Sequence, residues 1–273
     1  MKKSVCLLSL VILGGLSSCM KILDTKPTDV QSVTDYYKTE KELDNALTGI
    51  YDALGKEQPG YLITLFSTVD EMFTSNVTGL TIFDYDPGLL TVYTVWQRFY
   101  QGIERANMLL ANIDKPQIDE DRRKVIKGEA KFLRAYLYFM LVQNFGDVPL
   151  KLKPTASVDD IYYERTPADE VYTFIVKEMM EAESLVKPIT AYSYGGRVTQ
   201  SAVRGMLARV NLYWAGFPTN KPDKYKDALA WAKKVIDSGY HHLNPDYAQV
   251  FINLIQNKYE TKESIWELEF YTT

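Results

Sequence analysis

Seven segments of this 273-residue chain space their apolar residues three and four positions apart, the period of an α-helix with one buried face. Several begin at a capping residue or end at glycine or proline. Thr39 and Glu42, for example, form a capping box, and Gly55 follows the first segment. Thr166 is expected to cap the fourth segment, with Pro167 at its first position. Such a chain buries its apolar surface by packing helices on one another, so we expect a mainly all-α fold. The segments are 40–54, 89–113, 120–145, 167–187, 199–213, 224–238 and 246–255.

The helices pair as helix–turn–helix units, and residues 225–238 are similar to one tetratricopeptide helix. Their starts are unequally spaced, so we expect an irregular tetratricopeptide-like helical-repeat scaffold rather than a regular array. Two long loop excursions interrupt it, at 56–87 and 154–165. Gly128 in the long third helix is expected to let a neighbouring helix approach closely. Residues 265–270 alternate apolar and polar side chains, which predicts a strand.

The N-terminus has the pattern of a bacterial lipoprotein signal. Lys2 and Lys3 precede an apolar run over 5–16, which is too short to span a bilayer, and Leu16-Ser17-Ser18-Cys19 matches a lipobox. We therefore expect a signal peptide at 1–18, lipidation of Cys19, a tether at 19–34 and a helical domain at 35–273. The alternative is an ordinary signal peptide with an accidental cysteine. Cys6 lies in the discarded run, so the mature chain keeps one cysteine.

Composition argues against several functions. The net charge is −4, so phosphate-driven binding of nucleic acid is disfavoured. Two cysteines cannot make a disulfide framework, and two histidines cannot build a His-rich metal site. None of the common catalytic or nucleotide-binding motifs is present. Asp70 and Glu71 are adjacent, so their carboxylates point apart instead of converging on a bond. We expect neither catalytic residues nor a metal or cofactor, and interpret Glu129 and Arg134 as members of ion pairs.

The first loop excursion is the best candidate for ligand contact. It is rich in aromatic side chains, which stack on sugar rings, and carries carboxylate and amide groups that bind hydroxyls. Our candidate binding residues are Asp70, Asn76, Phe83 and Tyr85. The alternative is that these aromatic side chains pack the loop against the scaffold instead of contacting a ligand. Trp96 lies on an apolar helix face and is expected in the core.

Three stretches resemble the SusD/RagB family of outer-membrane nutrient-binding lipoproteins. The first runs from Gly128-Glu129-Ala130-Lys131-Phe132-Leu133-Arg134-Ala135-Tyr136 to Phe145-Gly146-Asp147-Val148-Pro149-Leu150. The second is Arg165-Thr166-Pro167-Ala168-Asp169-Glu170-Val171-Tyr172, and the third joins Gly196-Arg197-Val198-Thr199 to Leu207-Ala208-Arg209-Val210. They occur in family order and, with shorter matches near Leu23 and Tyr100, cover nearly the whole mature chain.

The resemblance implies a tetratricopeptide-like scaffold lipid-anchored to the outer membrane, which binds a glycan or peptide and hands it to a SusC-type TonB-dependent transporter. Family members are usually about twice this length, so we expect the chain to be the N-terminal portion of such a protein. Two alternatives stay open. One is a helical-repeat lipoprotein that binds only protein partners, and the other is an enzyme whose catalytic residues lie in the missing part.

Overall fold

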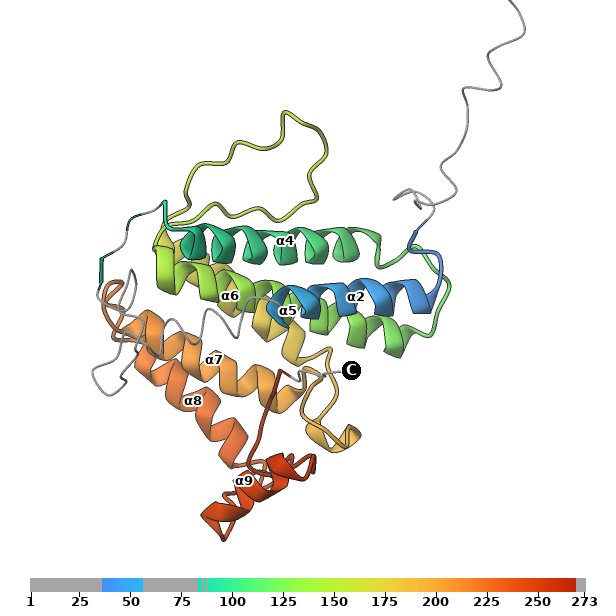
Figure 1. Cartoon of the computed structure of the whole chain (residues 1–273), viewed down its shortest axis with the longest axis vertical. Helices are drawn as coiled ribbons and strands as arrows, with labels where there is room; N and C mark the ends of the chain where they lie inside the picture. The colour runs from blue at the N-terminus through green and yellow to red at the C-terminus, as the bar shows by residue number, and fades with distance from the viewer. Residues whose placement is uncertain (1–35, 56–82, 85, 87, 269–273) are drawn as a thin grey trace, which may run out of the picture. The chain divides into compact units, whose positions relative to one another are not determined.

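The seven segments with helical spacing are helices in the computed structural model, which describes residues 36–55, 83–84, 86 and 88–268 (Figure 1). A short 3-10 turn, η2 (Ile189–Ala191), lies between the fourth and fifth of them. The helices are α2 (Glu40–Gly55), α4 (Leu90–Asn112), α5 (Glu120–Phe145), α6 (Ala168–Glu183), α7 (Gln200–Ala215), α8 (Lys224–Ile236) and α9 (Tyr247–Ile255).

Capping side chains fix where the helices begin. The backbone N–H of Thr39 donates to the Glu42 carboxylate at 2.8 Å and that of Glu42 to the Thr39 hydroxyl at 3.2 Å, which confirms the capping box. The Asp119 carboxylate accepts from the first turn of α5, and Thr199 caps α7. Gly146 ends α5 at a φ of 68°, a conformation that glycine adopts without strain.

The start of α6 differs from the sequence expectation. We expected Thr166 to cap this helix with Pro167 at its first position, but Pro167 itself is the capping residue and makes no side-chain cap. The carboxylate of Asp147 accepts from the Ala168 N–H at 2.8 Å instead. Thr166 is occupied elsewhere, because its backbone pairs with that of Val148 in an isolated antiparallel bridge.

Each helix packs on the next along the chain, from α2 and α4 through α5, α6, α7 and α8 (Figure 1). This order is that of stacked helical hairpins and places α5 against α2, α4, α6 and α7. Most of α5 is buried, including Phe132, Leu133, Leu137 and Phe139. The mainly α-helical prediction is confirmed.

The strand expected at 265–270 is wrong for the part that the structure describes. Residues 265–268 lie in no strand, and no neighbouring strand is present among the described residues to pair with them. Their backbone bonds to the turn before α7, where Glu267 N–H donates to the Gly195 carbonyl at 3.1 Å. Trp266 packs edge-on against Phe132 and Tyr136, so this apolar side chain of the segment lies against α5.

The described residues from Tyr37 onward belong to one compact unit. The expected signal peptide at 1–18, the tether at 19–34 and Cys19 lie outside the described residues. In the described part of the chain, no helix combines the length and the apolar character needed to cross a bilayer.

Candidate ligand-binding groove

Of the four binding residues proposed from the sequence, only Phe83 falls on the described part of the chain. Its side chain is 69% exposed, and its backbone has a φ of 58° in the segment that leads into α4. Asp70, Asn76 and Tyr85 lie outside the described residues. These four assignments therefore stay predictions, and the described geometry directs attention to the neighbouring helix α4.

A groove of about 470 Å³ runs along one face of α4. The α4 side chains that form its wall recur every three or four positions, so they share one side of the helix. The opposite wall comes from the segment after α5. The α4 groove is lined by Tyr93, Trp96, Gln97, Tyr100, Gln101, Ile103 and Glu104 with Lys151 and Thr155.

Aromatic rings form the base of the α4 groove. The ring of Trp96 lies 4.9 Å from that of Tyr100 and packs edge-on against Phe145 at 5.0 Å, while Tyr93 is 56% exposed. Trp96 is only partly buried, so our expectation that it belongs to the core is wrong. Helical spacing places Trp96 on the apolar face of α4. One side of its ring nevertheless stays uncovered, because it faces the open groove next to Lys151 and Thr155.

Hydrogen bonds hold the opposite wall in place. The Lys151 ammonium lies 2.9 Å from the Glu104 carboxylate, which also accepts from the Thr155 N–H at 2.8 Å. Asn107 donates to the Lys151 carbonyl at 3.0 Å, and the Tyr138 hydroxyl donates to the same oxygen at 2.7 Å. Because these contacts tie the segment to α4 and α5, the α4 groove is formed before any ligand arrives.

Tyr100 joins the two walls. Its hydroxyl donates to the Pro149 carbonyl at 2.7 Å, and burial raises the pKa of this phenol well above its ordinary value. The phenol therefore stays protonated and keeps donating across the neutral and mildly alkaline range.

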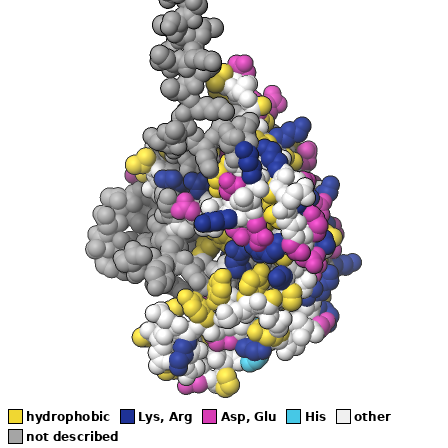
Figure 2. All heavy atoms as spheres, turned by 90° about the vertical axis from the view of Figure 1, so that its right-hand side faces the viewer, with side chains coloured by type: hydrophobic (Ala, Val, Ile, Leu, Met, Phe, Trp, Pro, Cys, Tyr) yellow, Lys and Arg dark blue, Asp and Glu magenta, His cyan; other side chains and the backbone are white. Residues whose placement is uncertain are grey.

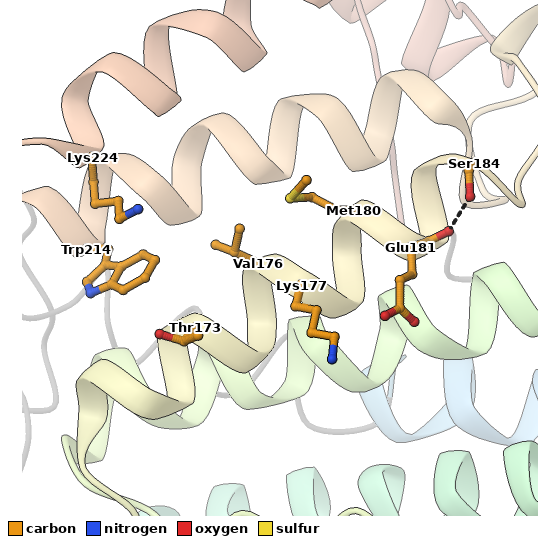
Figure 3. Close-up of a pocket in the computed structure, with 8 residues that line it drawn as sticks. All are labelled: Thr173, Val176, Lys177, Met180, Glu181, Ser184, Trp214 and Lys224. Carbon is orange, nitrogen blue, oxygen red and sulfur yellow. Dashed lines mark hydrogen bonds between the residues drawn. The ribbon is translucent and has the colours of Figure 1, made fainter.

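A second groove, of about 540 Å³, lies between α6 and the start of α8 (Figure 3). Its one large aromatic side chain is Trp214, which is 6% exposed, stacked on Tyr172 and covered by the Lys224 ammonium at 4.5 Å. The indole N–H already donates to Asp169 at 2.8 Å. Because this ring is engaged by the protein, the α4 groove is the better candidate for stacking a sugar.

The described residues hold no group of three or more histidine, cysteine or acidic side chains placed to bind a metal ion. Both histidines of the chain, His241 and His242, are described, and His241 contacts the Lys262 carbonyl through Nδ1 at 3.1 Å. Glu129 and Arg134 form the expected ion pairs, with Arg197 at 2.8 Å and Glu178 at 2.6 Å respectively.

Sequence reasoning missed the α4 groove because it placed Trp96 on the buried face of this helix. The signal was present. Residues 93, 96, 97, 100, 101 and 104 form a second stripe on the helix, in which aromatic side chains alternate with glutamine and glutamate. An aromatic stripe mixed with polar groups differs from an aliphatic core face, and it indicates a surface that is only partly covered.

The fold and its motifs match a known family. Residues 21–212 match the SusD-like profile described as "Starch-binding associating with outer membrane". The chain belongs to the SusD family. This confirms the resemblance drawn from the three motif stretches. The SusD-like protein P38 of Formosa agariphila is 30% identical over 77% of the chain, and the starch-binding protein SusD of Bacteroides thetaiotaomicron is 27% identical over 89%.

Solved structures of the SusD family share the fold. A SusD homologue from Bacteroides thetaiotaomicron superposes with a TM-score of 0.74 at 24% identity, and covers 88% of this chain and 48% of its own. A protein described as a laminarin-binding SusD-like protein gives 0.64 at 24% identity, over 79% of this chain and 49% of its own. The chain spans about half the length of the curated relatives it matches, 42% of P38 and 46% of the starch-binding protein.

Proposed function

We propose that this SusD-family protein captures an oligosaccharide in the α4 groove without acting on it chemically. The observation that carries the proposal is the partly open aromatic base at Trp96 and Tyr93, set against a wall of polar groups. Sugar rings present apolar C–H faces that pack on aromatic rings, and their hydroxyls bond to amides and carboxylates. Phe83 stands in the sequence just before α4, and Asp70, Asn76 and Tyr85 stay predicted contacts from the preceding segment.

The rigidity of the α4 groove favours binding of a flexible oligosaccharide. Ordering a loop on binding costs free energy, and the wall at Lys151 and Thr155 is already ordered by Glu104, Asn107 and Tyr138. The relatives named for starch and laminarin support a glycan as the ligand class. A peptide ligand is the alternative that binding experiments have to distinguish.

We place the captured glycan at the outer membrane. Acylation of Cys19 would anchor the chain, and a SusC-type TonB-dependent transporter would be the partner that receives the ligand. An anchor of this kind makes each encounter between the two proteins effectively intramolecular, so ligand released from the α4 groove meets the transporter at high local concentration. Energy for uptake would come through the transporter.

Calorimetric titration with a panel of neutral and acidic oligosaccharides tests the proposal. We expect Trp96→Ala to weaken binding of the best ligand at least tenfold, equivalent to about 1.4 kcal/mol. Trp231→Ala is the matched control, because Trp231 is also partly buried but lies on α8, with the Lys234 ammonium 3.7 Å from its ring centre. If both variants bind the ligand with equal affinity, the ligand does not bind at Trp96. Hydrolysis of the ligand by the protein would contradict the proposal that it binds the ligand without acting on it.

A further inference from the structure

Aromatic and amide side chains repeat along the α4 wall of the groove. Trp96 and Tyr100 are four positions apart, and so are Gln97 and Gln101. Four residues advance an α-helix by about 6 Å, so each ring and each amide is followed by another of its kind about one turn further on. The aromatic side of this row is extended by Tyr93, which is 56% exposed. The wall therefore offers the same pair of groups more than once along a single line.

The row is also straight and of defined length. Helix α4 runs without a break from Leu90 to Asn112, and side chains four positions apart form a row inclined by only about 26° to the helix axis. The α4 side chains that line the groove begin at Tyr93 and end at Glu104, a stretch of about 16 Å along the axis. A ligand that contacts the whole row must therefore be extended over the same length.

The charges in the described lining of the α4 groove compensate each other. Charged side chains of both signs crowd the face of the molecule that Figure 2 shows. In the described lining, only Glu104 and Lys151 are charged, and they form an ion pair at 2.9 Å. The amides of Gln97 and Gln101 are exposed, and the Gln101 oxygen accepts from Arg98 at 3.2 Å, so its N–H groups remain to donate. Ring shape and the positions of hydroxyls are thus left to select the ligand.

We propose that the α4 groove selects an extended, β-1,4-linked oligosaccharide that lies along α4 with about one sugar ring per helical turn. This inference rests on the capture proposed above and names the class of glycan. The rings of a β-1,4-linked chain form a flat ribbon, so successive C–H faces can pack on the aromatic row while hydroxyls at the ribbon edge reach the amides.

An α-1,4-linked chain coils instead, so only part of it can follow a straight row. The inference therefore separates this chain from its relative named for starch, which is an α-1,4-linked glucan.

Calorimetric titration with pentasaccharides that differ in linkage tests the inference. The β-1,4-linked ligands are cellopentaose, mannopentaose and xylopentaose, and the coiled ligand is maltopentaose, which has the same glucose units as cellopentaose. We expect the best β-1,4-linked ligand to bind at least tenfold more tightly than maltopentaose. Gln97→Ala and Gln101→Ala should each weaken its binding about threefold, through the loss of a hydrogen bond. Gln117→Ala is the matched control, because Gln117 is also exposed but lies in the turn between α4 and α5.

The failure of this inference is distinguishable from that of the proposed function. If maltopentaose or an acidic oligosaccharide binds at least as tightly as every β-1,4-linked ligand, and Trp96→Ala weakens that binding, the linkage preference is wrong and capture in the α4 groove stands. Unchanged affinity of both glutamine variants for a β-1,4-linked ligand would also overturn the inference. If Trp96→Ala weakens the binding of no oligosaccharide at all, both proposals are wrong.

Discussion

At the scale of single residues, Glu129 joins three separate parts of the fold. Its carboxylate accepts from the Tyr51 hydroxyl of α2 at 2.7 Å and from Arg197, in the turn before α7, at 2.8 Å. The Val198 N–H in turn donates to the Tyr51 oxygen at 3.1 Å. Burial is the main cause that raises the pKa of Tyr51 well above its ordinary value, so this phenol stays a donor.

Removing this carboxylate is predicted to destabilise the protein strongly. Glu129 is fully buried, so Glu129→Ala leaves the Arg197 guanidinium and the Tyr51 hydroxyl without their partner, a loss of about 3 kcal/mol in the free energy of unfolding. Glu181→Ala is the control. Its carboxylate also accepts from a lysine but is 46% exposed, so the loss should stay below about 1 kcal/mol. Urea unfolding of both variants measures the difference, and equal losses would contradict the role of Glu129.

At the scale of helices, the close approach of a neighbouring segment to Gly128 on α5 predicts that a larger side chain there is unfavourable. A Cβ there would lie 2.7 Å from Leu185 Cβ and 3.2 Å from the Val186 backbone nitrogen, whereas a Cβ at Gly205 on α7 meets nothing within 4 Å. Alanine is the better helix former at both positions. We expect Gly128→Ala to lose about 1–2 kcal/mol through overpacking and Gly205→Ala to gain about 0.5–1 kcal/mol. Thermal melts with the same sign for both variants would contradict this.

The helices were predictable because their signals are local. The capping box at Thr39, the Asp119 cap and the Gly146 stop lie within a few residues of the boundaries they set. Features that depend on partners distant in the sequence could not be predicted in this way. Asp147 takes the cap expected of Thr166, and residues 265–268 lack a strand to pair with among the described residues.

The α4 groove was missed for a related reason. A helical period states which residues share a face of α4, but whether Trp96 is covered depends on where the segment around Lys151 and Thr155 folds back. That path is set by Asn107 and Tyr138, more than ten residues away from Lys151 in the sequence. The family, in contrast, was recognisable from motifs that keep the scaffold together, such as Glu129 and Arg134.

At the scale of the whole molecule, the proposed capture role needs the chain to stay at the membrane. We propose acylation of Cys19 as the anchor, because this residue ends the lipobox of the sequence. A single acyl chain binds a membrane only marginally, whereas two or three anchor a protein stably. The lipobox of Leu16-Ser17-Ser18-Cys19 predicts the latter.

Cys19→Ser is therefore predicted to release the protein from the membrane fraction of the producing bacterium and to abolish incorporation of labelled fatty acid. Cys6→Ser is the matched control, because Cys6 lies in the segment expected to be removed with the signal peptide and should leave both properties unchanged. Fractionation of cells grown with labelled palmitate measures the two together. Membrane retention of Cys19→Ser would show that another contact holds the protein there, and capture next to a transporter would then rest on that contact instead of on the lipid.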